Sequence, residues 1–152
     1  MGVDTGLDIE ALLAFAGCDS AHFIGAQSGG SIAMTFAARQ PVRVKSLVAV
    51  APMITGTPDT TRWLRQIERA GVLAWARGTM AGRLGNNATP AQVNYWAEQI
   101  QGRTPLSTLQ SYLPWVPGVD IRPDFPKVKC PTLVMATTGS GLRPIEGVKA
   151  WQ

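Results

Sequence analysis

The sequence predicts an α/β fold in which a parallel sheet is interrupted by a helical insertion. Two apolar runs without polar alternation, Leu47–Ala51 and Pro131–Ala136, are typical of strands buried on both faces. A third run, Ala21–Ile24, leads through a glycine-rich turn into a helical pattern over residues 29–39. Strand, helix and following strand then form a βαβ unit, whose crossover is expected to be right-handed. Residues 58–113 have a helical composition and separate this unit from the last strand.

Composition and charge exclude several classes of protein. The formal net charge is only +4, and the 14 Lys and Arg residues are scattered, so we expect no nucleic-acid partner. No apolar run reaches the length of a membrane span, and the first residues are acidic where a secretory signal would be basic. The two cysteines form neither a metal motif nor a disulfide framework. We therefore expect a cytoplasmic protein without membrane contact, and the sequence shows no sign of a metal or redox cofactor. It gives no prediction of the oligomeric state.

The individual helices are predicted from apolar spacing and capping residues. Gly17 ends a first helix that starts near Asp8, and Thr89 and Pro90 cap and open a helix in the insertion. Three apolar stripes each lie along one face of a predicted helix: Ile9, Leu12, Leu13 and Ala16; Trp63, Leu64, Ile67 and Gly71; Val93, Trp96, Ala97 and Ile100.

These patterns divide the chain into three parts. Residues 1–57 form the βαβ part with its glycine-rich turn, and residues 58–113 form a helical cap. Residues 114–152 return to the core with a late strand and a helix that begins at Pro144. Pro105 opens a short helix, and the four prolines between Pro114 and Val128 exclude long regular structure there.

The glycine-rich turn is the segment most suited to chemistry. Residues 23–33 read strand, tight turn and helix, with small residues on both sides of the turn. Such a turn exposes one strained residue at its apex and lets the strand and the helix approach closely. The backbone N–H groups of Ser28 and Gly29 then lie at a helix N-terminus, which attracts anions whatever the side chains are.

With this turn, the sequence resembles the α/β-hydrolase superfamily, and within it members similar to 3-oxoadipate enol-lactonases. Five segments carry the resemblance in the right order: HFIGAQSGGSIAM, ARQPVRVKSLVAV, GTPDTTRW, VKCPTLVMA and RPIEGVKAWQ. The resemblance implies a parallel sheet with a helical cap and cofactor-free hydrolysis of a small ester, lactone or related carbonyl compound. It also implies that the turn is the nucleophile elbow of the family.

Two registers of this elbow are open. Aligning Gly25, Gly29 and Gly30 with the family pattern Gly-x-Ser-x-Gly-Gly puts Gln27 at the nucleophile position, and a primary amide cannot form an acyl-enzyme. A shift by one residue makes Ser28 the nucleophile, with the N–H of Gly29 in the oxyanion hole. The candidate catalytic residues are therefore Gln27 and Ser28, and the candidate anion-binding residues are Ser28 and Gly29.

The remaining members of a catalytic triad are missing from the sequence. The only histidine, His22, lies at the start of the elbow strand, whereas the family's histidine follows the last strand. No carboxylate follows Val50 or Met135 directly, where the family's acid commonly lies. The chain thus looks like a fragment that lacks the N-terminal strands and the C-terminal histidine region. We expect a hydrolase that is catalytically incomplete as given; the alternative is a degenerate homologue that binds a small molecule without hydrolysing it.

Overall fold

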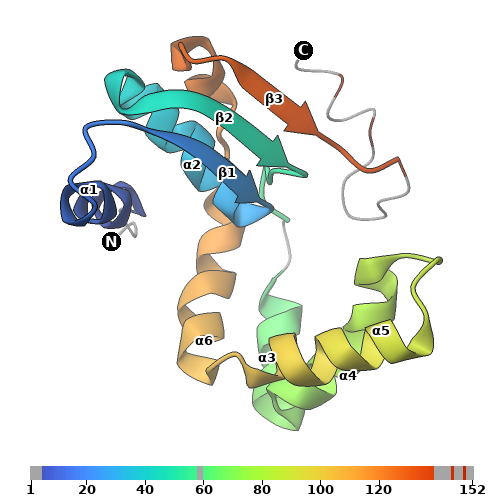
Figure 1. The fold of residues 1–152 in the computed structure, drawn as a ribbon. Helices are drawn as coiled ribbons and strands as arrows, with labels where there is room; N and C mark the ends of the chain where they lie inside the picture. The colour runs from blue at the N-terminus through green and yellow to red at the C-terminus, as the bar shows by residue number, and fades with distance from the viewer. Residues whose placement is uncertain (1–4, 58–59, 139–144, 146–148, 150–152) are drawn as a thin grey trace. The chain divides into compact units, whose positions relative to one another are not determined.

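The chain folds into two compact units, which are described one at a time. A computed structural model describes residues 5–57 and 60–138, together with residues 145 and 149 (Figure 1). The first unit contains the described residues up to 56 and residues 119–136. The second contains residues 57 and 60–118 and the described residues after 136. No helix among the described residues is both long enough and apolar enough to cross a bilayer.

The first unit is built on a three-stranded parallel sheet, as the sequence predicts. Its strands are β1 (Ala21–Ala26), β2 (Val44–Val50) and β3 (Thr132–Met135), with β2 in the middle. Ile24 pairs with Val48, and Val48 pairs with Leu133, so every strand points in the same direction. The carboxyl ends of all three strands therefore meet at one edge of the sheet.

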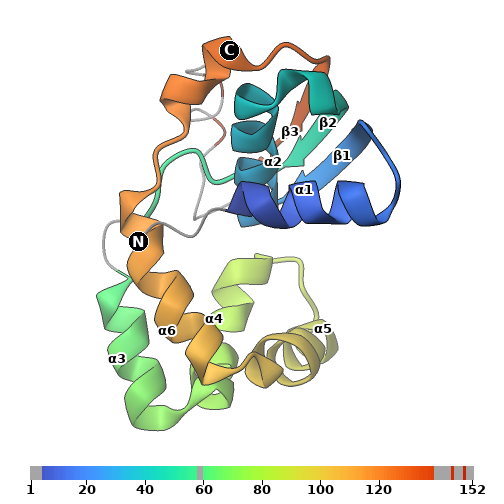
Figure 2. The same cartoon turned by 90° about the vertical axis from the view of Figure 1, so that its left-hand side faces the viewer.

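Helix α2 (Ser28–Arg39) covers one face of this sheet. Its inward side chains, including Met34 and Phe36, are buried, and the Phe36 ring packs 5.7 Å from the ring of Phe23 in β1. Figure 2, turned by 90° from Figure 1, shows α2 to one side of the strands. The short 3-10 segments η1 (Pro41–Arg43) and η5 (Arg122–Lys127) complete this part of the chain.

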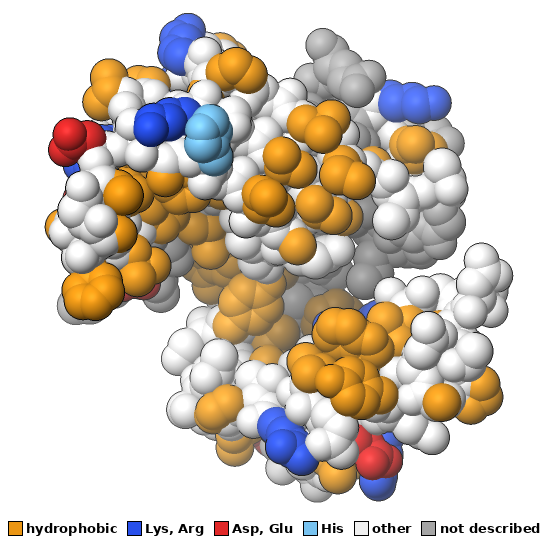
Figure 3. Space-filling view, viewed as in Figure 1, with side chains coloured by type: hydrophobic (Ala, Val, Ile, Leu, Met, Phe, Trp, Pro, Cys, Tyr) orange, Lys and Arg blue, Asp and Glu red, His pale blue; other side chains and the backbone are white. Residues whose placement is uncertain are grey.

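The opposite face of the sheet is apolar and open to solvent among the described residues. Ile24 is 80% exposed, Leu133 56% and Met135 50%. The strand register puts these three side chains on the same face, opposite the buried Leu47 and Ala49. Figure 3 shows hydrophobic side chains gathered over the strands there. We call Ile24, Leu133 and Met135 the open sheet face.

The second unit is helical. It contains α3 (Thr61–Ala70), α4 (Val72–Leu84), α5 (Pro90–Tyr95) and α6 (Leu106–Trp115), with a π-helix, η2 (Trp96–Ile100), and the 3-10 segments η3 (Gln101–Arg103) and η4 (Val116–Gly118). Its core is a single apolar cluster: Ile67, Trp75, Ala76, Met80, Ala97, Leu109 and Leu113. The buried hydroxyl of Thr60 donates to the carbonyl of Leu113, which ties the start of α3 to the end of α6.

Capping of α5 follows the sequence prediction. The Thr89 side chain accepts a hydrogen bond from the N–H of Gln92, and the Gln92 side chain accepts one from the N–H of Thr89. This reciprocal pair is a capping box, with Pro90 at the first helical position. Pro105 immediately precedes α6, as predicted, and α6 continues to Trp115 with Pro114 inside it.

Two predicted apolar stripes are only partly buried. In α1 (Thr5–Phe15) Leu13 is buried, but Leu12 is 66% exposed. In the insertion Ala97 is buried, whereas Trp96 and Ile100 are 44% and 46% exposed. Residues 96–100 form a π-helix, whose wider turn departs from the i, i+3, i+4 periodicity on which the predicted stripe is based. The helix predicted from Pro144 lies outside the described residues, apart from Ile145 and Lys149, which are helical.

The segments that leave and re-enter the first unit lie side by side. Thr55 and Asp120 form an antiparallel bridge. The N–H of Gly56 donates to the carbonyl of Val119 at 2.8 Å, and the N–H of Ile121 donates to that of Ile54 at 3.0 Å. We call this pair of segments the stem.

Candidate functional site

Gln27 forms the apex of the turn between β1 and α2. Its backbone has φ 52° and ψ −123°, a conformation that favours glycine, and its N–H continues the sheet by donating to the carbonyl of Val50 at 2.9 Å. The Gln27 side chain is exposed and makes no capping hydrogen bond to the helix. Gln27 is thus a strained residue on a strand-to-helix turn, at the carboxyl end of a parallel strand.

Glycine is required where the strand and the helix meet. A Cβ atom added to Gly25 would lie 2.5 Å from the carbonyl oxygen of Gly29 and 2.7 Å from the backbone nitrogen of Gly30. One added to Gly30 would lie 3.0 Å from the carbonyl oxygen of Gly25 and 3.2 Å from the Cβ of Pro52. The glycines therefore let β1, α2 and the segment after β2 approach closely enough to make the turn.

A second strained residue lies beside the first. Ala51, directly after β2, has φ 44°, and its N–H donates to the carbonyl of Met135 at 2.7 Å. Because Ala26 pairs with Val50, Gln27 and Ala51 are neighbours at the carboxyl edge of the sheet. Of the described non-glycine residues, these two are the ones with positive φ.

Ser28 and Gly29 are the first two residues of α2. Ser28 is partly buried, Gly29 is exposed, and neither has the positive φ of Gln27. Their backbone N–H groups lie at the positive end of a helix of 12 residues. The site thus brings together Gln27, Ser28 and Gly29 on one turn, with an amide side chain at its apex.

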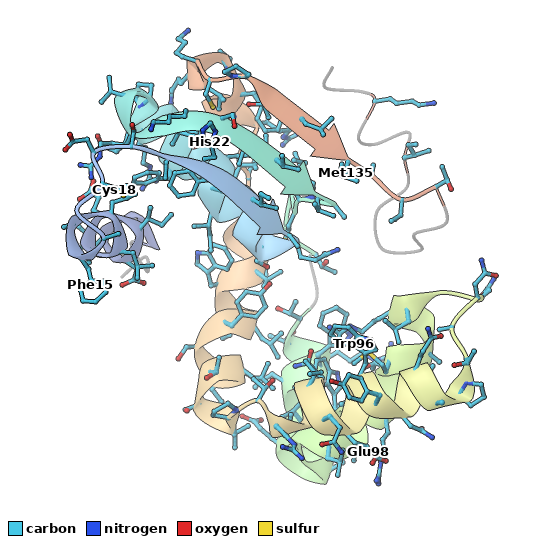
Figure 4. All side chains as sticks on the ribbon, in the orientation of Figure 1. Phe15, Cys18, His22, Trp96, Glu98 and Met135 are labelled. Carbon is cyan, nitrogen blue, oxygen red and sulfur yellow. The ribbon has the colours of Figure 1, made fainter. Side chains whose placement is uncertain are left out.

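His22 lies far from this turn. It is on β1, and its Nδ1 atom is 2.7 Å from the hydroxyl oxygen of Ser46 on β2. Gln27 lies five residue steps further along the chain, which is about 16 Å at the usual rise of a strand. Figure 4 shows His22 away from the carboxyl ends of the strands. His22 is therefore out of hydrogen-bond reach of both Gln27 and Ser28.

No described carboxylate follows β2 or β3 at the site. Residues 51–57 and 136–138 contain neither Asp nor Glu. Asp120 belongs to the stem, is exposed, and pairs with Arg122 at 2.6 Å. Hydrogen bonds from the side chain and backbone of Arg122 lower the pKa of Asp120 to about 2. This low pKa keeps the carboxylate of Asp120 ionised at neutral pH and makes it a weak base.

The tryptophans of the insertion have mixed environments. Trp75 is 4% exposed, and its ring lies 6.3 Å from that of Trp63 and 5.4 Å from the Arg83 guanidinium. Burial lowers the pKa of Arg83. Trp96 is half exposed, and its ring meets the ring of Tyr95 edge-on. Trp75 therefore serves the core of the helical unit, and it does not line an open site.

Sequence reasoning missed two residues that shape the turn. Ser31 is 1% exposed, and its hydroxyl donates to the carbonyl of Met53 at 2.6 Å. Ala51 is strained although alanine does not favour positive φ. The only signal for Ala51 in the sequence is Pro52, which disfavours a helical conformation of the residue before it. Ser31 carries no signal, because serine in the first turns of a helix is common.

Comparison with known proteins identifies the architecture through solved structures. No model of a protein family matches the sequence, and no curated protein matches it. An α/β-hydrolase enzyme from a deep-sea metagenome library is similar, with a TM-score of 0.77 and 22% identity over 97% of this chain. A thermophilic esterase from Thermogutta terrifontis, solved with malate bound, has a TM-score of 0.78 and 20% identity over 96% of this chain. An enol-lactonase from Burkholderia xenovorans has a TM-score of 0.76 and 16% identity over 96% of this chain.

The relatives are considerably longer than this chain. It covers 57% of the deep-sea hydrolase, 57% of the esterase and 68% of the enol-lactonase. At these identities the likeness concerns the fold alone. One of the three structures is described as an α/β-hydrolase enzyme, one as an esterase and one as an enol-lactonase.

Proposed function

The chain has the α/β-hydrolase fold, and on that premise we propose that it binds a small carboxylate or carbonyl compound at the elbow without hydrolysing it. One observation carries the proposal: the residue with the strained backbone at the apex of the turn is Gln27. An amide donates and accepts hydrogen bonds but provides no ionisable nucleophile. A ligand oxygen would accept hydrogen bonds from the N–H groups of Ser28 and Gly29 and from the Gln27 amide.

The electrostatics of the turn support an anionic or strongly polarised ligand. The N-terminus of α2 is the positive end of a 12-residue helix, and no acidic residue lies in its first turn. The amide at the apex adds a donor without adding charge. Malate, a hydroxy-dicarboxylate bound in the solved Thermogutta terrifontis esterase, is a suitable first probe.

A second candidate function is hydrolysis of a small ester or lactone with Ser28 as the nucleophile. The observation in its favour is that the similar structures are an esterase and an enol-lactonase. In this case the base and the acid come from outside the described residues. A cytoplasmic location is proposed for either function, since Cys18 and Cys130 are both free thiols.

The test measures malate binding and ester turnover on the same variants. Malate should shift the backbone amide NMR signals of residues 27–30, and Gln27→Ala should weaken its affinity about tenfold, the scale of one hydrogen bond to a charged group. Gln110→Ala, which changes an exposed glutamine in α6, is the matched control and should leave the affinity unchanged. A malate response elsewhere, or none at 27–30, would refute the binding proposal.

Turnover separates the two candidates. If the proposal holds, hydrolysis of a 4-nitrophenyl ester by the wild type stays at the level of Ser28→Ala. If the wild type hydrolyses the ester, and Ser28→Ala abolishes this while Gln27→Ala does not, then the chain is a hydrolase and Ser28 its nucleophile.

A further inference from the structure

The buried hydroxyl of Ser31 joins the elbow to the segment after β2. Ser31 lies one turn into α2 and is 1% exposed. Its oxygen is 2.6 Å from the carbonyl oxygen of Met53, to which it donates, and 3.3 Å from the carbonyl oxygen of Gln27. Met53 is itself 2% exposed, so this hydrogen bond is shielded from water. A hydrogen bond in such surroundings cannot be replaced by a bond to solvent.

The same two segments are connected by the backbone. The N–H of Met53 is 3.4 Å from the Gln27 carbonyl, which also accepts the first helical hydrogen bond of α2, from the N–H of Ser31 at 3.2 Å. The Gln27 carbonyl thus serves both the helix and the segment after β2. The hydroxyl of Ser31 adds a side-chain hydrogen bond between the same two segments, to the carbonyl of Met53.

Each of the two segments that the Ser31–Met53 hydrogen bond joins contains, or directly follows, a residue of positive φ. Gln27 precedes α2 and Ala51 precedes the segment that contains Met53. Strained backbone persists only where the surroundings over-determine it. We infer that Ser31 is the positioning residue of the elbow: its hydroxyl holds the Gln27 and Ala51 backbones in their strained conformations together. The effect on ligand affinity described below rests on the proposed function, whereas the effect on the two backbones does not.

Removal of the hydroxyl has consequences at a distance. Without it, the buried carbonyl of Met53 loses its partner, and the segment after β2 is free to relax toward ordinary φ at Ala51. The Gln27 turn then loses one of its supports, which moves the N–H groups of Ser28 and Gly29 relative to each other. A ligand held by both N–H groups should bind less tightly.

The experiment compares Ser31→Ala with Ser111→Ala in the full chain. Ser111 is a matched control because its hydroxyl also donates to the carbonyl four residues earlier, that of Ser107 at 3.0 Å, but on an exposed helix. In Ser31→Ala the NMR signals of Gln27 and Ala51 should both move, although Ala51 lies on another segment. Malate affinity should fall by roughly tenfold. Ser111→Ala should change neither.

Each outcome bears on a different statement. A folded Ser31→Ala protein with unchanged signals at Gln27 and Ala51 would overturn the inference. If both signals move and the wild type does not bind malate, the positioning role of Ser31 holds and the proposed function fails. If Ser31→Ala does not fold, Ser31→Cys replaces it: its thiol is a weaker donor of similar shape, so both signals should move in that variant too, and unchanged signals would overturn the inference.

Discussion

Gln27 and Ala51 hold backbone conformations that cost roughly 1–3 kcal/mol each in ordinary residues. At Gln27 this cost is offset by two backbone hydrogen bonds. Its N–H donates to the carbonyl of Val50 on β2, and its carbonyl accepts from the N–H of Ser31 in α2. The side chain at this strained position is an amide, which donates and accepts hydrogen bonds but provides no ionisable nucleophile.

The glycines around the turn differ in what they contribute, and this gives a stability prediction. Gly25→Ala should destabilise the protein by about 3 kcal/mol, because the new Cβ would meet backbone atoms of Gly29 and Gly30 that cannot move without distorting the turn. Gly29→Ala is the matched control, since an added Cβ there finds nothing within 4 Å.

Urea unfolding of the two variants measures the difference. Gly29→Ala should be neutral or stabilising by up to about 1 kcal/mol, as expected for alanine in a helix. Equal stability of Gly25→Ala and the wild type would show that β1 and α2 do not approach as closely as described.

The sequence leaves the register of the turn open, because the register depends on which residue adopts the backbone conformation with positive φ. Gln27 and Ser28 are both polar, and both lie between the small residues Gly25 and Ala26 and the pair Gly29 and Gly30. Only the backbone angles separate them, since positive φ falls on Gln27. Glutamine does not favour that conformation, so no propensity in the sequence indicates which residue adopts it.

At the scale of elements, the clearest sequence signal is also the easiest to test. Thr89→Ala should destabilise the helical unit by about 1 kcal/mol, because the capping box at the start of α5 loses one of its two hydrogen bonds and disturbs the other. Thr108→Ala, on the exposed side of α6, should change stability by less than about 0.5 kcal/mol. A smaller effect at Thr89 than at Thr108, measured by thermal unfolding, would contradict the capping role.

The helices and strands were predictable where a local sequence signal determines them, and their ends were not predictable where tertiary packing determines them. Apolar runs gave all three strands, but Gly25 was expected to end β1 and instead lies inside it. That glycine serves a close approach to α2, which only the folded arrangement requires. The π-helix at residues 96–100 was also not predictable, because no residue type in it signals a change of helical period.

At the scale of the whole molecule, the open sheet face is the most conspicuous departure from a closed globular protein. A dye that fluoresces on apolar surfaces should bind the protein, and Ile24→Lys should reduce its binding severalfold by placing a charge on that face. Val42→Lys is the control, because Val42 is 82% exposed but lies in η1, outside the sheet. Equal loss of dye binding in both variants would locate the apolar surface elsewhere.

The fold class was predictable because it depends on the order of a few apolar runs, which the sequence shows directly. The prediction that the run Pro131–Ala136 is buried on both faces is wrong, since Leu133 and Met135 lie exposed on the open sheet face. The catalytic residues of the site were less predictable from the sequence. A triad depends on residues distant in sequence that meet at the carboxyl edge of the sheet, and here no described His or carboxylate meets Gln27 or Ser28 there. Absence of these partners is visible in the sequence, whereas the coupling of Gln27 to Ala51 through Ser31 becomes visible only in three dimensions.

The stem gives the helical insertion a topological independence from the sheet. Since Thr55 and Asp120 are bridge partners, the chain returns to within roughly 5 Å of the point where it departed. The whole segment between Thr55 and Asp120 therefore connects two neighbouring points of the first unit, as a surface loop would. The entropic cost of closing such a loop grows only slowly with its length. Exchange of the insertion for another with closely spaced ends would leave the connectivity of the sheet intact.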